Sequence, residues 1–222
     1  ASVSEGTNAG TIVGAGGLTK TGIQTLSLSG GNSYAGATLI NQGVLNIQNG
    51  SALGSGVGST TVASGAALEL QGSITVSGEA LELNGSGVSS GGALRSVSGT
   101  NVWGGLVTLG SASRINADAG VLSVGGSVVV GGYGLTVGGA GDVVFGGVFG
   151  GGVGGLTKDG IGTLTLNGVN TFSGATVVSG GTLVGVSGAF GSTSSIAVNG
   201  ARLSAVDYNS VAGLSVDGSG YA

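Results

Sequence analysis

The chain has 222 residues, of which 54 are glycine, and it contains no proline, cysteine, methionine or histidine. Glycine at this level usually indicates collagen or a disordered linker, but collagen needs proline and a Gly-X-Y period, and disorder needs high charge and low hydrophobicity. With 40% hydrophobic and 6% charged residues and a net charge of −4, the sequence predicts an ordered, aliphatic protein punctuated by glycine.

Short strands are predicted along the whole chain, because an apolar-polar-apolar triplet recurs in chain order. Side chains alternate between the faces of a strand, so each triplet points two aliphatic residues to the core and one polar residue to solvent. Glycine and Asn-Gly steps, which favour turns, bound the triplets, and no segment shows helical periodicity with caps. The triplets are centred on Ser27, Asn46, Glu69, Thr75, Glu82, Thr108, Ser123, Thr136, Thr165 and Ser215.

One uncharged stretch, residues 119–141, is 23 residues long and therefore long enough to cross a bilayer as a helix. Glycine and β-branched valine dominate it, and glycine costs about 1 kcal/mol per helix position relative to alanine. We therefore expect no membrane-spanning segment there.

The chain repeats itself at a spacing of 138 residues. Residues 16–45 and 154–183 align without a gap, and 17 of the 30 positions are identical. Glycine richness alone does not produce this match, because Lys20 and Lys158, Asn32 and Asn170, and the leucines also coincide. Self-similarity of this kind is typical of repeat architectures.

A parallel β-helix fits these features better than a sandwich or a closed barrel. Its interior strands are paired on both sides, which excludes proline, and glycine supplies its tight corners. At roughly 20 residues per turn, the sequence predicts about 11 rungs spaced about 4.8 Å apart. Residues 1–222 are thus expected to form a single β-helix segment.

The motif G-G-L-T-K-x-G-x-x-T-L-x-L, then N-x-[YF]-x-G-A-T and G-x-L, resembles the passenger-associated transport repeat (the autotransporter-associated β-strand repeat) of bacterial autotransporters. Residues 79–95 and 113–120 are similar to the spacers between such repeats. The resemblance implies a right-handed parallel β-helix that Gram-negative bacteria export to the cell surface or release. It implies secretion and surface presentation, not a particular activity. Together with the missing catalytic chemistry, the repeated motif predicts an extracellular structural or adhesive stalk segment that supports export and surface presentation and is not catalytic.

The start of the chain carries no basic, apolar leader, and its end carries no membrane barrel with aromatic girdles. We therefore expect a piece of a longer passenger. A solenoid exposes unpaired strand edges at its ends, and no capping helix is visible. The protein is thus expected to continue past both ends, or copies are expected to associate end to end or side by side.

The two repeat copies place the same kinds of side chain at equal positions. We interpret Lys20 and Lys158 as solvated turn cations that keep the surface soluble, with a repeated ligand contact as the alternative. Tyr34, Phe172 and the single tryptophan, Trp103, are interpreted as core residues because aromatics bury large areas, with sugar stacking or binding as the alternative.

Glu69, Glu79 and Glu82 form the one local acidic cluster. Paired carboxylates cleave glycosidic bonds, so a polysaccharide-cleaving enzyme on the same fold is the alternative function. Glu69 and Glu82 are central in their triplets and no histidine or arginine is near in sequence, so isolated, outward-facing glutamates are favoured. No catalytic or cofactor-binding residue and no cofactor is predicted.

The remaining motifs predict no functional site. Asp142 follows a glycine run that misses the spacing of the calcium-binding β-roll by one residue, so no metal site is predicted. Glycine-rich phosphate loops are expected by chance at this composition, and the regular threonine array of ice-binding surfaces is missing. Five basic residues do not form a phosphate-binding stripe, so nucleic acid is not an expected partner. A host-surface or glycan ligand is an expected partner.

Overall fold

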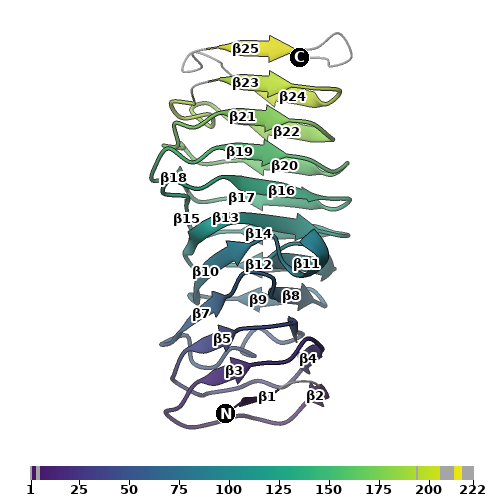
Figure 1. The fold of residues 1–222 in the computed structure, drawn as a ribbon, viewed down its shortest axis with the longest axis vertical. Helices are drawn as coiled ribbons and strands as arrows, with labels where there is room; N and C mark the ends of the chain where they lie inside the picture. Colours follow the sequence, from purple (N-terminus) through teal and green to yellow (C-terminus); the bar gives the residue numbers. More distant parts are fainter. Residues whose placement is uncertain (1, 4–5, 194, 206–212, 217–222) are drawn as a thin grey trace.

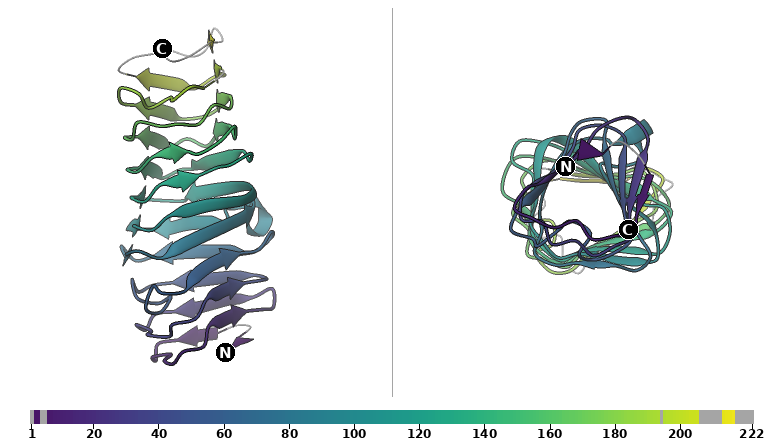
Figure 2. Two further views of the ribbon diagram at one scale, coloured as in Figure 1. Left: turned by 90° about the vertical axis from the view of Figure 1, so that its left-hand side faces the viewer. Right: turned by 90° about the horizontal axis from the view of Figure 1, so that it is seen from below.

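The computed structural model describes residues 2–3, 6–193, 195–205 and 213–216, which form a rod of stacked, parallel strands (Figure 1). The chain winds around the long axis, and each turn lays its strands beside those of the turn before. The view along the axis in Figure 2 shows the strands arranged around a common interior. The predicted all-β parallel β-helix is confirmed.

The strands stack into three columns, which we call A, B and C. Column A holds the strands that open each turn in the lower and middle part of the rod. They are β1 (Ser2–Val3), β3 (Leu18–Lys20), β5 (Thr38–Ile40), β7 (Ser59–Val62), β10 (Ala80–Gly85), the first part of β13 (Val107–Ala117), β15 (Val128–Val129) and β18 (Phe149–Gly150).

Column B runs through eleven strand positions of the described chain. They are β2 (Gly6–Asn8), β4 (Thr25–Leu28), β6 (Val44–Ile47), β8 (Ala67–Gln71), β11 (Leu94–Ser98), the second part of β13, β16 (Leu135–Gly139), β19 (Leu156–Lys158), β21 (Thr176–Val178), β23 (Ile196–Val198) and β25 (Leu214–Val216). The predicted number of about 11 rungs agrees with this column.

Column C forms a separate seven-stranded sheet. It contains β9 (Thr75–Val76), β12 (Thr100–Trp103), β14 (Val121–Val124), β17 (Asp142–Phe145), β20 (Thr163–Leu166), β22 (Thr182–Gly185) and β24 (Arg202–Ala205). Columns A and B are joined through the long strand β13, which belongs to both.

The rod interior is filled by the aliphatic residues of the triplets. Nine of the ten triplets bury both aliphatic side chains, as the alternation predicts. The exception is the last triplet, where Leu214 and Val216 remain 46% and 37% exposed. Their strand, β25, pairs with β23 on one side only, so the described chain covers just one of its edges.

One polar triplet centre departs from the prediction, because Asn46 is only 5% exposed. It lies on the outer face of column B, where its amide nitrogen donates to Glu69 at 3.1 Å and to Gln71 at 3.2 Å. Neighbouring long polar side chains cover it, so the outward direction was predicted correctly and the burial was not.

The two repeat copies face different sides of the rod. Their L-T-K strands are β3 in column A and β19 in column B, and their T-L-x-L strands are β4 in column B and β20 in column C. The same motif is therefore rotated by one column between its copies. Turn length varies along the rod, so a spacing of 138 residues does not return the chain to the same column.

Residues 119–141 form β14, β15 and β16 rather than a helix, as expected. Within the described ranges, no helix has the length and hydropathy needed to cross a bilayer, and the one helical segment is a 3-10 turn, η1 (Val88–Ser90). The prediction about the two ends of the rod concerns in part residues 1, 4–5 and 217–222, which lie outside the described residues.

Candidate functional surface

The repeat lysines are buried, which corrects their interpretation as solvated turn cations. Lys20 is 0% exposed and ends strand β3. Its Nζ donates to the carbonyl oxygens of Thr21 and Gly22 in its own turn, at 2.9 and 2.7 Å, and of Gln42 one turn later, at 3.1 Å. An ammonium group has three donors, so the three carbonyls match it.

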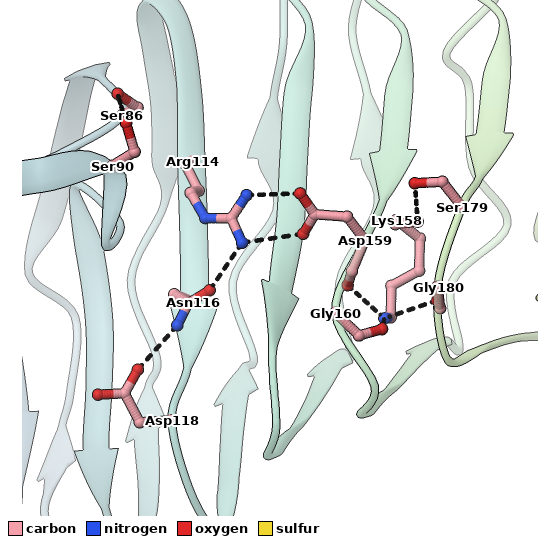
Figure 3. Close-up of polar contacts among 10 residues, drawn as sticks. All are labelled: Ser86, Ser90, Arg114, Asn116, Asp118, Lys158, Asp159, Gly160, Ser179 and Gly180. Carbon is pink, nitrogen blue, oxygen red and sulfur yellow. Dashed lines mark hydrogen bonds and ion pairs between the residues drawn. The ribbon is translucent and has the colours of Figure 1, made fainter.

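Lys158 repeats this arrangement in column B. Its Nζ donates to the carbonyl oxygens of Asp159, Gly160 and Gly180 at 2.6, 2.8 and 3.2 Å (Figure 3). Burial lowers the pKa of the Lys158 amine, and the nearby Asp159 carboxylate partly opposes this shift. The triplet alternation could have found both lysines, because a leucine-threonine-lysine strand that buries its leucine also points its lysine inward.

The repeat asparagines also link successive turns. Asn32 accepts the backbone N–H of Ile12 at 2.8 Å and donates to the carbonyl of Ala52 at 2.6 Å. Asn170 does the same between Phe149, at 2.7 Å, and Ala189, at 2.5 Å. Each side chain thus connects the turn before its own with the turn after it. Lysine and asparagine are the polar connectors of the repeat.

The aromatic residues lie in the core, as predicted. Tyr34, Phe172 and Trp103 are 2%, 0% and 0% exposed. The hydroxyl of Tyr34 is 2.6 Å from the hydroxyl of Thr38, and burial raises the pKa of Tyr34 to about 12. Phe172 packs edge-on against Phe149 with the ring centres 4.8 Å apart. None of these rings offers a surface platform for sugar stacking.

A ladder of charged and amide side chains follows the outer face of column B. Arg95 binds Glu69 at 2.9 Å and Asp118 at 2.6 Å, and its hydrogen bond to Asp118 raises the pKa of the guanidinium. Asn116 donates to Asp118 at 2.8 Å and accepts from Arg114 at 3.0 Å. This ladder was missed because its members come from turns that are far apart in sequence.

The ladder ends in an ion pair that spans a turn. The two terminal nitrogens of Arg114 donate to the two carboxylate oxygens of Asp159 at 2.7 and 2.9 Å (Figure 3). Arg114 belongs to β13, and Asp159 follows β19, so strand β16 lies between them. A Cβ atom on Gly138 in β16 would lie 2.1 Å from Asp159 Oδ1 and 2.3 Å from Arg114 Nη2. The missing side chain leaves room for the pair.

An open groove of about 660 Å³ lies beside this ion pair. The segment around η1 borders the groove with Ser86 and Ser90. Other polar residues that line the groove include Arg114, Asp159, Thr136 and Thr157. Ser89 and Ser90 have φ angles of 50° and 59°, a left-handed conformation that is uncommon outside glycine. The groove is of the size usual for small-ligand sites and combines hydroxyls and the paired guanidinium and carboxylate with apolar side chains such as Val153 and Val177. It is the candidate binding surface.

The three glutamates of the acidic cluster do not form one site. Glu69 faces outward from column B, and Glu82 faces outward from column A and accepts a bond from Asn84 at 3.2 Å. Glu79 is 3% exposed and accepts a hydrogen bond from Thr60 at 2.7 Å, so the prediction of isolated outward glutamates is wrong for this residue. Arg95, which is distant in sequence, pairs with Glu69 in space, so Glu69 faces outward as predicted but is not isolated.

No group of three or more acidic side chains within the described ranges is arranged to hold a metal ion. Asp142 instead accepts the backbone N–H of Thr163 at 2.7 Å, one turn along column C. The glycine-rich residues 146–152 include β18 and bends of the solenoid.

Comparison with protein families locates the repeat independently. The model of the passenger-associated transport repeat matches residues 18–47 and 156–184, the two segments that align with each other. Each of these two segments is thus similar to one passenger-associated transport repeat. Their buried lysines and asparagines are the turn-to-turn connectors described above.

A curated relative supports the same assignment. Over 107 residues, or 48% of the chain, the sequence is 37% identical to the adhesin BmaC autotransporter of Brucella suis biovar 1 (strain 1330). The aligned part covers 3% of that protein's length. Both findings agree with the predicted resemblance to autotransporter passenger segments. No solved structure matches the chain significantly.

Proposed function

We propose that the chain is a non-catalytic β-helical stalk segment that supports passenger export and presents an adhesive surface outside the cell. The proposal is carried by one observation: each transport repeat contains a buried lysine and a buried asparagine that tie neighbouring turns together. Such connectors favour turn-by-turn folding, because each new turn supplies acceptors for donors already in place.

The proposed role in export is tested by displaying the chain on the surface of a Gram-negative host. The chain, with an N-terminal epitope, is fused between a secretion signal and an outer-membrane translocator barrel in a Gram-negative host. We expect antibody to stain intact cells, and we expect less staining and more periplasmic degradation for the Lys20→Met/Lys158→Met variant. The control is Arg202→Met, because Arg202 is an exposed cation in β24. Equal staining of all three would contradict the role of the repeats in export.

Adhesion is assigned to the groove beside Arg114 and Asp159. Its hydroxyl, guanidinium and carboxylate groups suit a polar, hydroxyl-bearing ligand such as a glycan, which these groups recognise through hydrogen bonds. The BmaC relative is an adhesin by name, and we extend that role to this segment as part of the proposal.

The adhesive role is tested with beads that carry the purified chain on a fixed epithelial cell layer. Filling the groove with Thr136→Tyr is expected to reduce bead retention to the level of uncoated beads. Thr165→Tyr is the matched control, since Thr165 is central in its triplet on column C, away from the groove. Retention that is unchanged by Thr136→Tyr would remove the groove from the proposal.

A further inference from the structure

A second, smaller pocket of about 290 Å³ lies where the chain passes from column C to column A. Its walls come from two neighbouring turns, residues 49–56 and residues 75–79. Oxygen-bearing residues dominate the lining, among them Asn49, Ser51, Ser55, Ser77 and Glu79. The pocket thus offers oxygen ligands around a single carboxylate.

The carboxylate of Glu79 is unusually placed for an acidic side chain. The residue is 3% exposed, and one of its oxygens, Oε1, accepts a hydrogen bond from Thr60 at 2.7 Å. No lysine or arginine in the described part of the chain forms an ion pair with it. A buried carboxylate without a cationic partner is costly, and burial raises the pKa of Glu79 accordingly.

The other oxygen, Oε2, lies near Gly56, and both residues line the pocket. A Cβ atom built on Gly56 would lie 3.9 Å from Glu79 Oε2 and also 3.9 Å from the carbonyl oxygen of Ser77. Gly56 has a φ of 72°, a conformation that other residues rarely adopt. This backbone conformation favours glycine, so no side chain stands beside the two oxygens.

The second repeat copy provides an internal comparison. In the first copy, Thr38 is paired in register with Thr60, whose hydroxyl holds Glu79. In the second copy, Thr176 is paired with Ile196, which has no hydroxyl. The Thr60 hydroxyl that holds Glu79 therefore has no counterpart in the strand beside the second copy.

We propose that this pocket binds a calcium ion, with Glu79 as its charged ligand and neutral oxygens of the pocket, including the Ser77 carbonyl, as further ligands. Calcium takes oxygen ligands in flexible geometry, whereas magnesium demands a tight octahedron and zinc prefers nitrogen and sulfur. One carboxylate predicts weak binding, with a Kd on the order of 10⁻⁴–10⁻³ M, as in other extracellular modules. The inference goes beyond the proposed function and does not depend on adhesion.

The test is thermal unfolding of the purified chain, followed by the fluorescence of the buried Trp103, with calcium chloride at about ten times its Kd. Binding to the folded state alone raises Tm, here by about 3–5 °C for a chain of this size. We expect this shift in the unaltered protein and in Glu82→Gln, and we expect its loss in Glu79→Gln. Magnesium chloride at the same concentration is expected to give a smaller shift.

Terbium luminescence provides a second measurement that needs no folded variant at Glu79. Terbium occupies calcium sites and is sensitised by a nearby tyrosine, and Glu79 is close enough to Tyr34 to raise its pKa. Trp103, whose strand pairs with the pocket residue Val76, is a second sensitiser, and we expect luminescence that calcium displaces. An equal Tm shift in the unaltered protein and Glu79→Gln, no shift in either, or terbium luminescence unaffected by calcium would each overturn the proposal. None of these results bears on export or bead retention.

Discussion

Arg114 and Asp159 form a bidentate ion pair across strand β16, which has a glycine, Gly138, between them. The pair joins β13 to the residue after β19, at 2.7 and 2.9 Å, over Gly138 of β16. The Asp159 backbone also takes part in the Lys158 arrangement, since its carbonyl accepts from Nζ at 2.6 Å (Figure 3). One residue therefore connects the outer ladder of column B with a buried lysine.

Gly138→Ala is expected to cost about 1 kcal/mol, because the new methyl group displaces an ion pair whose members are partly exposed. In the Arg114→Ala/Asp159→Ala background the sign should reverse, since alanine is favoured over glycine within a strand by about 0.5–1 kcal/mol. Urea unfolding of the four proteins forms the double-mutant cycle. A cost that is the same in both backgrounds would show that Gly138 is needed for another reason.

Replacing either buried lysine should destabilise the rod strongly. Lys20→Met or Lys158→Met leaves three partly buried carbonyls without their donor, which predicts a loss of about 3 kcal/mol in the free energy of unfolding. Urea unfolding followed by Trp103 fluorescence measures it, with the exposed Arg202→Met as control. If the three variants unfold at the same urea concentration, the lysines do not hold the turns together.

The pH dependence of stability should carry the signature of Lys158. Its folded pKa is lowered by burial from 10.5, with Asp159, Asp142 and Arg114 as the charged groups that act on it. Between the folded pKa and 10.5 the unfolded chain binds more protons, so this lysine makes stability rise with pH in that window and leaves it flat below. Comparing the unaltered protein with Lys158→Met in urea from neutral pH to pH 10.5 isolates the slope, which should be absent from the variant.

Tyr34 and Phe172 occupy equal positions in the repeat but should not be interchangeable. Tyr34→Phe removes the partner of the Thr38 hydroxyl and is expected to cost about 1 kcal/mol. Phe172→Tyr buries a hydroxyl where Thr176 already lies 3.3 Å from Thr193, and should cost about 1–3 kcal/mol. Thermal unfolding of both variants checks the order. A stabilising Phe172→Tyr would show that the two corners are equivalent.

Much of this fold follows from local patterns in the sequence. The triplets decide which aliphatic residues are buried, because strand side chains alternate in direction whatever the surrounding fold. The aligned copies at 16–45 and 154–183 indicate a solenoid, and the absence of proline fits strands paired on both sides. The aromatic corner of Tyr34 and Phe172 follows from the same reasoning.

The tertiary structure alone decides which residues from different turns meet. These contacts depend on how many residues each turn uses. Examples are the columns of β3 and β19, the partners of Arg95 and Arg114, and the carbonyls around Lys20 and Lys158. A shift of one turn changes every lateral neighbour while leaving each triplet intact, so the core is predictable locally and the surface is not.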